Sequence, residues 1–263
     1  MTTIKPIRLA LKDASIMDAP ADKTLAVRFI PLAAAVNAAY RERLGGLSNH
    51  GATVGASDPI VLVAAIADFL TVSDQLDAQY GADSPLPLAN ADAAADEALR
   101  FATELDPWLD RFELATFRGE LYAVMLGVGL WAMRHDLAIA SPEPIVNALA
   151  HRANEASSKQ ETAAAYAMMQ GFIDHLAPSL AADLERSNPE RPWRLLNLNF
   201  AITAIRTGDA ALMRFAFDVF NTYLPDERAG FYEEACTVAA QPGFPLDTRA
   251  LIEAEHAKWT RLH

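Results

Sequence analysis

Hydrophobic residues recur along most of the chain with the three- and four-residue spacing of α-helices. No segment alternates between apolar and polar positions over a useful length, and β-branched residues are scattered. The pattern therefore predicts an all-α protein without a sheet, built as an irregular multi-helix stack or bundle with a helical-hairpin arrangement. About ten helices are expected, near 25–44, 58–80, 90–105, 107–134, 142–155, 159–186, 192–206, 209–223, 226–240 and 247–261.

Proline residues mark several of the predicted boundaries. Proline is favoured in the first turn of a helix, and a preceding Asp, Asn or Ser can cap that turn. Four pairs fit this pattern: Asp58-Pro59, Asp106-Pro107, Ser141-Pro142 and Asn188-Pro189. Pro31 and Pro178 fall inside predicted helices, where a kink or a break is expected.

Connections between the helices favour a single all-α domain over residues 1–263. Residues 1–24 are expected to form an N-terminal arm, and a softer division is expected near residue 106. The glycine-rich segment 45–57 is either a long connection or an anion-binding loop before a helix N-terminus. Its His50 is expected to be solvated.

Three segments, 107–134, 192–206 and 209–223, are apolar nearly all round and should form a layered centre. Gly127-Val-Gly129-Leu-Trp-Ala132 has the spacing of a dinucleotide-binding turn. That turn needs a preceding strand and a full helix after it, and the pattern predicts neither. The two glycines are therefore interpreted as a place where another helix approaches closely.

Composition and charge narrow the classes of partner. The chain is 52% hydrophobic, which excludes a disordered protein. The net charge is −12, divided evenly: residues 1–112 hold 9 basic and 15 acidic residues, and residues 113–263 hold 13 and 19. Phosphate backbones and anionic membranes need concentrated Lys and Arg, so no nucleic acid and no membrane is expected as a partner.

The apolar runs of the chain and its single cysteine bear on where the protein is located in the cell. The early apolar run Leu9–Leu11 is too short for a signal peptide, and the run Leu121–Met133 is shorter than a membrane-spanning helix. We therefore expect a soluble cytoplasmic protein.

Alanine makes up about a fifth of the chain and Arg outnumbers Lys, which is typical of a GC-rich bacterial genome. The single Cys236 excludes disulfide scaffolds and is expected in the core.

Candidate chemistry rests on polar residues within otherwise apolar helices. If a ligand site exists, these side chains should converge on it: Glu120, Arg134, Gln170, His175, Asn197, Asn199, Arg206 and Glu255. Glu255 would either pair with an Arg of a neighbouring helix or act as a functional carboxylate. Glu253 and His256 form one E-x-x-H pattern, but di-iron bundles need two copies, so neither a metal nor another cofactor is expected.

Two functions from different classes remain. The first is a soluble helical protein-interaction module, a scaffold or adaptor that binds a protein partner or associates with itself as a homodimer. The alternative is a helical-bundle small-molecule-binding protein or enzyme with a polar pocket between central helices. The sequence leaves open whether the protein is an enzyme. Trp108 and Trp193, each placed after a proline, are expected to pack across helix junctions.

Overall fold

The structure is a computed structural model, and it describes residues 24–45, 55–180, 192–241 and 244–260. These residues form ten α-helices and no strand, which confirms the all-α prediction. The helices are α1 Leu25–Gly45, α2 Pro59–Tyr80, α3 Ala91–Arg111, α4 Arg118–Arg134, α5 Glu143–Glu155, α6 Lys159–Leu180, α7 Pro192–Thr207, α8 Ala210–Tyr223, α9 Arg228–Ala239 and α10 Leu246–Thr260. The predictions for residues 1–23, for His50 and for Asn188-Pro189 lie outside the described residues.

The chain divides into two compact units, Met17–His151 and Arg152–His263, here called the N-terminal and the C-terminal unit. The prediction of a single domain stays a prediction, as does the predicted centre that would combine α4 with α7 and α8.

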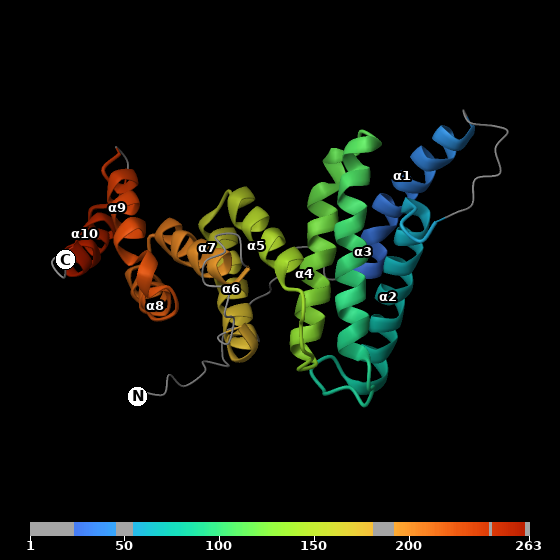
Figure 1. The fold of residues 1–263 in the computed structure, drawn as a ribbon, viewed down its shortest axis with the longest axis horizontal. Helices are drawn as coiled ribbons and strands as arrows, with labels where there is room; N and C mark the ends of the chain where they lie inside the picture. Colours follow the sequence, from blue (N-terminus) through green and yellow to red (C-terminus); the bar gives the residue numbers. More distant parts are fainter. Residues whose placement is uncertain (1–23, 46–54, 181–191, 242–243, 261–263) are drawn as a thin grey trace. The chain divides into compact units, whose positions relative to one another are not determined.

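The N-terminal unit is built around four helices (Figure 1). Chain neighbours α1 and α2, α2 and α3, and α3 and α4 pack against each other, and α1 also contacts α4, which closes the bundle. Its interior is filled mainly by leucine and other aliphatic side chains, among them Leu32, Leu62, Ile66, Leu99, Leu105 and Leu121. Burying a side chain of this kind contributes about 1.5–3 kcal/mol.

In the C-terminal unit, successive helices pack as pairs. α6 contacts α7, α7 contacts α8, and α10 packs on both α8 and α9. The interior is aromatic: Tyr166 stacks on Phe200 with ring centroids 4.6 Å apart, and Phe217 meets Tyr232 edge to face at 5.3 Å. Trp193 is buried against Tyr223 at 4.9 Å, which confirms its predicted place at a helix junction.

Capping side chains stabilise the N-terminal ends of two of these helices, α6 and α8. Asp209 caps α8, because its Oδ1 accepts hydrogen bonds from the amides of Ala211 and Leu212 at 2.8 and 3.0 Å. Ser158 and Glu161 form a reciprocal capping box at the start of α6. Asp58 does not cap the helix that Pro59 begins; its Oδ2 accepts from the amide of Gly55 at 2.6 Å.

The prediction that a helix begins at Asp106-Pro107 is wrong. Pro107 lies inside α3, which continues to Arg111, and the chain turns at Glu113, whose φ is 60°. Leu105 and Leu109 on either side of the proline are fully buried, so the core contact across it outweighs one missing backbone hydrogen bond. Trp108 therefore lies in the last turn of α3, where it packs against Phe112 at 5.4 Å.

Two prolines and one glycine lie inside helices of the structure. Pro31 lies inside α1 without breaking it, and Pro178 lies inside α6. Gly127 lies where α1 and α4 meet, and a Cβ atom there would stand 2.1 Å from Cδ2 of Leu25. Gly127 thus serves close helix packing, as interpreted from the sequence.

Candidate functional site

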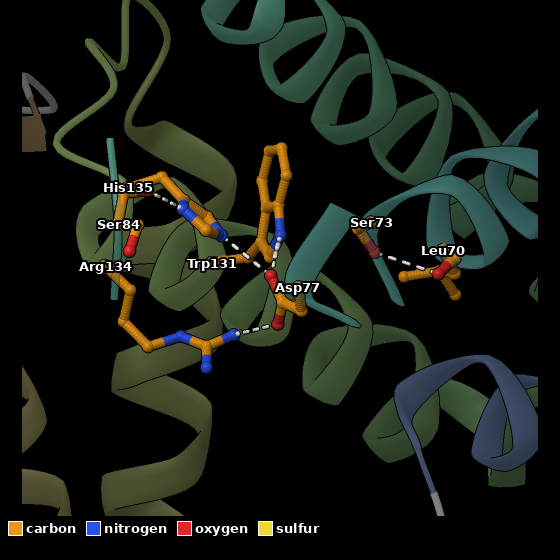
Figure 2. Close-up of polar contacts among 7 residues, drawn as sticks. All are labelled: Leu70, Ser73, Asp77, Ser84, Trp131, Arg134 and His135. Atoms are coloured by element: carbon orange, nitrogen blue, oxygen red, sulfur yellow. Dashed lines mark hydrogen bonds and ion pairs between the residues drawn. The ribbon is translucent and has the colours of Figure 1, made fainter. Parts of the chain in front are cut away.

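A group of connected, mostly part-buried polar contacts in the N-terminal unit lies where α2 and α4 end. It joins Asp77 of α2, Ser84 of the following connection, and Trp131, Arg134 and His135 at the end of α4 (Figure 2). We call these five residues the Asp77 cluster. They bring together two helices whose contacting residues lie more than fifty positions apart in the sequence.

Asp77 is the centre of this cluster. Its Oδ1 accepts hydrogen bonds from Trp131 Nε1 at 2.9 Å and lies 2.7 Å from His135 Nε2. Its Oδ2 accepts from Arg134 Nη2 at 3.1 Å. Three side chains at the end of α4 thus converge on one carboxylate.

His135 is held on both sides. Its side chain has no exposed surface, and Nδ1 lies 2.5 Å from the backbone oxygen of Ser84 while Nε2 faces Asp77. Trp131 covers the imidazole edge to face at 5.0 Å and meets Phe69 at 5.3 Å. A general base needs one ring nitrogen free to reach a substrate, and here both nitrogens are occupied.

The cluster therefore has the geometry of a structural junction. Ser84 takes part through its carbonyl oxygen, so its hydroxyl is not placed as a nucleophile by these contacts. The hydrogen bonds fix the C-terminal end of α2, the connection after Gly81 and the end of α4 relative to each other. Gly81 allows this connection to turn away from α2, since its φ is 90°.

The two predicted site residues of the N-terminal unit are Glu120 and Arg134. Glu120 is exposed in the first turn of α4, and Arg134 lies fourteen residues further along the helix, in its last turn. Arg134 belongs to the Asp77 cluster, where it forms an ion pair with the carboxylate.

Three predicted residues, Asn197, Asn199 and Arg206, lie on α7. Asn197 has no exposed surface, and its Nδ2 donates to the carbonyl of Trp193 at 2.9 Å. Its Oδ1 is buried without a hydrogen-bond partner among the described residues. Arg206 instead donates to the backbone oxygens of Ala153 and Ala156 at 2.5 and 3.4 Å, where it satisfies carbonyls at the end of α5.

The other predicted residues lie on α6 and α10. Gln170 and His175 are half-buried on α6, and Glu255 is half-buried on α10. The expected pairing of Glu255 with an Arg of a neighbouring helix is not what we find: Glu255 pairs with Lys258 of its own helix and accepts from Asn221 Nδ2 of α8 at 3.4 Å. The nearby Arg228 lies over the Trp259 ring, 4.3 Å from its centroid.

Glu255 nevertheless affects a buried neighbour. Burial raises the pKa of Tyr232, and the negative charge of Glu255 raises it further. The hydroxyl of Tyr232 donates a hydrogen bond to Oδ1 of Asn221 at 3.1 Å.

The eight predicted residues are thus distributed over α4, α6, α7 and α10, and the contacts resolved for Arg134, Asn197, Arg206 and Glu255 each involve a different partner. Their convergence on one ligand stays a prediction. In the described part of the chain, no group of three or more His, Cys, Asp or Glu side chains is placed to hold a metal ion. Cys236 is half-buried, and burial raises the pKa of its thiol, with a smaller effect from Glu253.

Asp77 and His135 are the residues that the sequence did not indicate. Trp131 and His135 are four positions apart and so share a helix face, which is a weak signal for a polar contact there. Nothing in the sequence places Asp77 opposite that face, because this depends on how α2 and α4 pack.

Comparison with known proteins provides no assignment: no family model, no curated protein and no solved structure matches the chain. Of the described helices, α2 is long and apolar enough to cross a membrane by length and composition, and a third of its most apolar window is buried. Core helices pass the same test, and α2 packs against both α1 and α3.

Proposed function

We propose that the protein is a helical interaction module that acts through the outward face of α1. The observation that carries this proposal is the exposure of Ile30 and Val27, which are 60% and 43% exposed. Pro31, Ala34 and Ala38 are exposed on the same side of the helix. These five residues, which we call the outer stripe, follow the spacing of one helix face.

The outer stripe is additional to the face that α1 uses for folding. Phe29, Leu32 and Val36 are buried in the N-terminal unit, so α1 is apolar on two sides. Single exposed hydrophobic residues are common, but a contiguous row is characteristic of a contact surface. The favoured partner is therefore another apolar helix face.

The size pattern of the outer stripe favours a second copy of this chain as the partner. The larger residues Val27, Ile30 and Pro31 lie toward the start of α1, and the small Ala34 and Ala38 follow. In an antiparallel pair centred near Ala34, the larger residues of each copy would lie over the alanines of the other. The stripe is one helix wide, and stable interfaces bury about 800 Å² per partner, so we expect a weak dimer.

Cross-linking tests this geometry. In a Cys236→Ser background, Ala34→Cys should form a disulfide-linked dimer under mild oxidation, because Ala34 lies near the proposed two-fold axis. Ala64→Cys is the matched control, since Ala64 is also an exposed helical alanine of the N-terminal unit. Equal cross-linking of both variants, or none by Ala34→Cys, would contradict the proposal.

A ligand-binding function has one specific observation in its favour. Asn197 is fully buried, and its Oδ1 has no hydrogen-bond partner among the described residues. Buried acceptors of this kind are usually satisfied by water or by a bound molecule. A thermal-shift screen against polar metabolites, with Asn197→Leu as the control, would support this second function if a stabilising compound lost its effect in the variant.

The composition supports a cytoplasmic location and a bacterial origin as parts of the same proposal. A net charge of −12 favours solubility and disfavours binding to nucleic acid. Fractionation of cells that express the full chain tests the location: the protein should be recovered in the soluble fraction, not with membranes.

A further inference from the structure

The outer stripe of α1 begins next to a segment whose own sequence is amphipathic. Residues 1–23 lie outside the described residues, and α1 starts directly after them, where Thr24 Oγ1 accepts from the amide of Val27 at 3.4 Å. Within residues 7–17, apolar side chains recur with the three- and four-residue spacing of one helix face: Ile7, Ala10, Leu11, Ala14 and Met17. A helix over this segment would carry a narrow apolar face that needs a partner.

The connection between this segment and α1 has the composition of a turn between two antiparallel helices. Residues 18–23 include Asp18, Pro20 and Asp22, which are typical turn residues, and connections of roughly 2–8 residues join neighbouring helices in bundles. At about 1.5 Å per residue, a helix over residues 7–17 would span about 15 Å, and the outer stripe from Val27 to Ala38 spans about 16 Å. The lengths match, and a stripe one helix wide suits a single helix.

Side-chain sizes along the two faces are complementary in this antiparallel arrangement. The outer stripe has its larger residues near the start of α1 and its small ones, Ala34 and Ala38, farther on. Residues 7–17 follow the same order along the chain, since Ile7 and Leu11 precede Ala14. Because the chain reverses, Ile7 and Leu11 would lie over the two alanines of α1. The small Ala14 would lie beside the larger residues, so large side chains meet small ones along the contact, as close helix packing requires.

We propose that residues 7–17 fold back as a helix and cover the outer stripe of α1 within a single chain. This regulation rests on the proposed function, because it acts on the same surface. A short connection gives the segment an effective concentration in the millimolar range, so it competes with a second copy of the chain for the stripe. Only chains in which the segment has left the stripe can pair, which lowers the apparent affinity of the dimer. The segment is thus an autoinhibitory element of the dimer interface.

Intramolecular cross-linking of the full chain tests the cover without depending on dimerisation. In a Cys236→Ser background, Ala10→Cys with Ala34→Cys should form a disulfide within one chain under mild oxidation at low protein concentration, because both residues lie on the proposed contact faces. Leu9→Cys with Ala34→Cys is the matched control, since Leu9 is adjacent in sequence but lies on the opposite side of the helix. A disulfide needs Cα atoms within about 7 Å, so the control should link much less. Equal linking by both pairs, or none by the Ala10 pair, would overturn the proposal.

Sedimentation velocity tests the consequence for self-association. Leu11→Asp should release the stripe, because the charge cannot be buried against it, and half-dimerisation should then need about tenfold less protein than in the native chain. Leu9→Asp should behave like the native chain, and adding Ile30→Asp to Leu11→Asp should abolish the dimer. A native chain that dimerises no more weakly than Leu11→Asp would contradict autoinhibition.

The two experiments separate the cover of the stripe from the proposed dimer. If neither the native chain nor Leu11→Asp dimerised while the Ala10 pair still cross-linked, the dimer would be wrong and the cover would stand. If the native chain dimerised through the stripe while the Ala10 pair failed to cross-link, the dimer would stand and the cover would be wrong.

Discussion

At the scale of single residues, two buried polar side chains of the C-terminal unit, Tyr232 and Asn197, differ in how well their polar atoms are satisfied. Tyr232 is among the largest fully buried side chains, and its hydroxyl bonds Asn221. Asn197 is equally buried but leaves one oxygen unsatisfied. A satisfied and an unsatisfied group in similar surroundings should respond to substitution in opposite ways.

Tyr232 should make the fold sensitive to alkali. Its pKa is raised in the folded state, so the unfolded chain loses the phenol proton first as pH rises above the ordinary tyrosine value of about 10. Stability that is fully present below that pH should then be lost as pH rises further. In Tyr232→Phe, stability at neutral pH should fall by about 1 kcal/mol, and the alkaline loss should be smaller. Denaturant unfolding at neutral and alkaline pH measures both effects, and an unchanged alkaline loss in the variant would refute this explanation.

Asn197→Leu should leave the fold intact and raise its stability by about 1 kcal/mol, because it removes a buried acceptor that lacks a partner. Asn199→Leu on the same helix is the control, since Asn199 is half-exposed and its amide can reach water. Thermal unfolding of the two variants compares them directly. A clear loss of stability in Asn197→Leu would mean that Oδ1 has a partner, such as bound water.

Some residue roles depend only on the helix that carries the residue, and the sequence predicted these roles well. Other roles depend on a contact with a partner helix, and these were predicted poorly. Gly127 was interpreted correctly, because a glycine inside an apolar helix has few structural roles other than close packing against another helix. His135 and Asp77 were missed because their contact exists only after α2 and α4 pack. Glu255 was recognised as unusual, but its partners Lys258 and Asn221 were not foreseen.

At the scale of helices, the hydrophobic period predicted most segments well, and the main error came from a proline. Pro107 signalled a helix start, but the buried Leu105 and Leu109 continue one core face across it. Core burial is a tertiary effect that no local signal contains. The break occurs instead at residues 112–117, where Arg118 then binds Asp106 and Asp110 at 2.8 Å each.

Two glycines of α4 give a matched test of helix packing. In Gly127→Ala, the added methyl meets Leu25, and crowding of this kind costs about 1–3 kcal/mol, which exceeds the roughly 1 kcal/mol by which alanine favours a helix. Gly119→Ala meets nothing within 4 Å, so it should stabilise the protein slightly. Thermal unfolding should therefore give shifts of opposite sign.

Leu25→Ala provides the control for that pair. If the contact between α1 and α4 causes the loss, Gly127→Ala should no longer destabilise the protein when residue 25 is alanine. Two Gly→Ala variants with the same sign of shift would show that α1 does not approach α4 at Gly127 as described.

At the scale of the whole molecule, the chain forms two compact units, and the surface that most needs an explanation is the outer stripe of α1. The hydrophobic content of the sequence predicted a substantial core, but it could not show which apolar residues remain exposed on the surface. Val27 and Ile30 look like core residues in the sequence, and only the packing of α1 on α2 and α4 reveals that they face outward.

Sedimentation velocity over a range of protein concentrations tests the proposed interaction most directly. The native chain should sediment faster as concentration rises, as expected for a weak dimer. Ile30→Asp should remain monomeric, because a charge would be buried in the interface. Ile202→Asp, which changes an isoleucine that is 45% exposed on α7, should behave like the native chain. The account would be contradicted if the native chain stayed monomeric at every concentration. It would also be contradicted if the Ile30→Asp variant dimerised as strongly as the native chain.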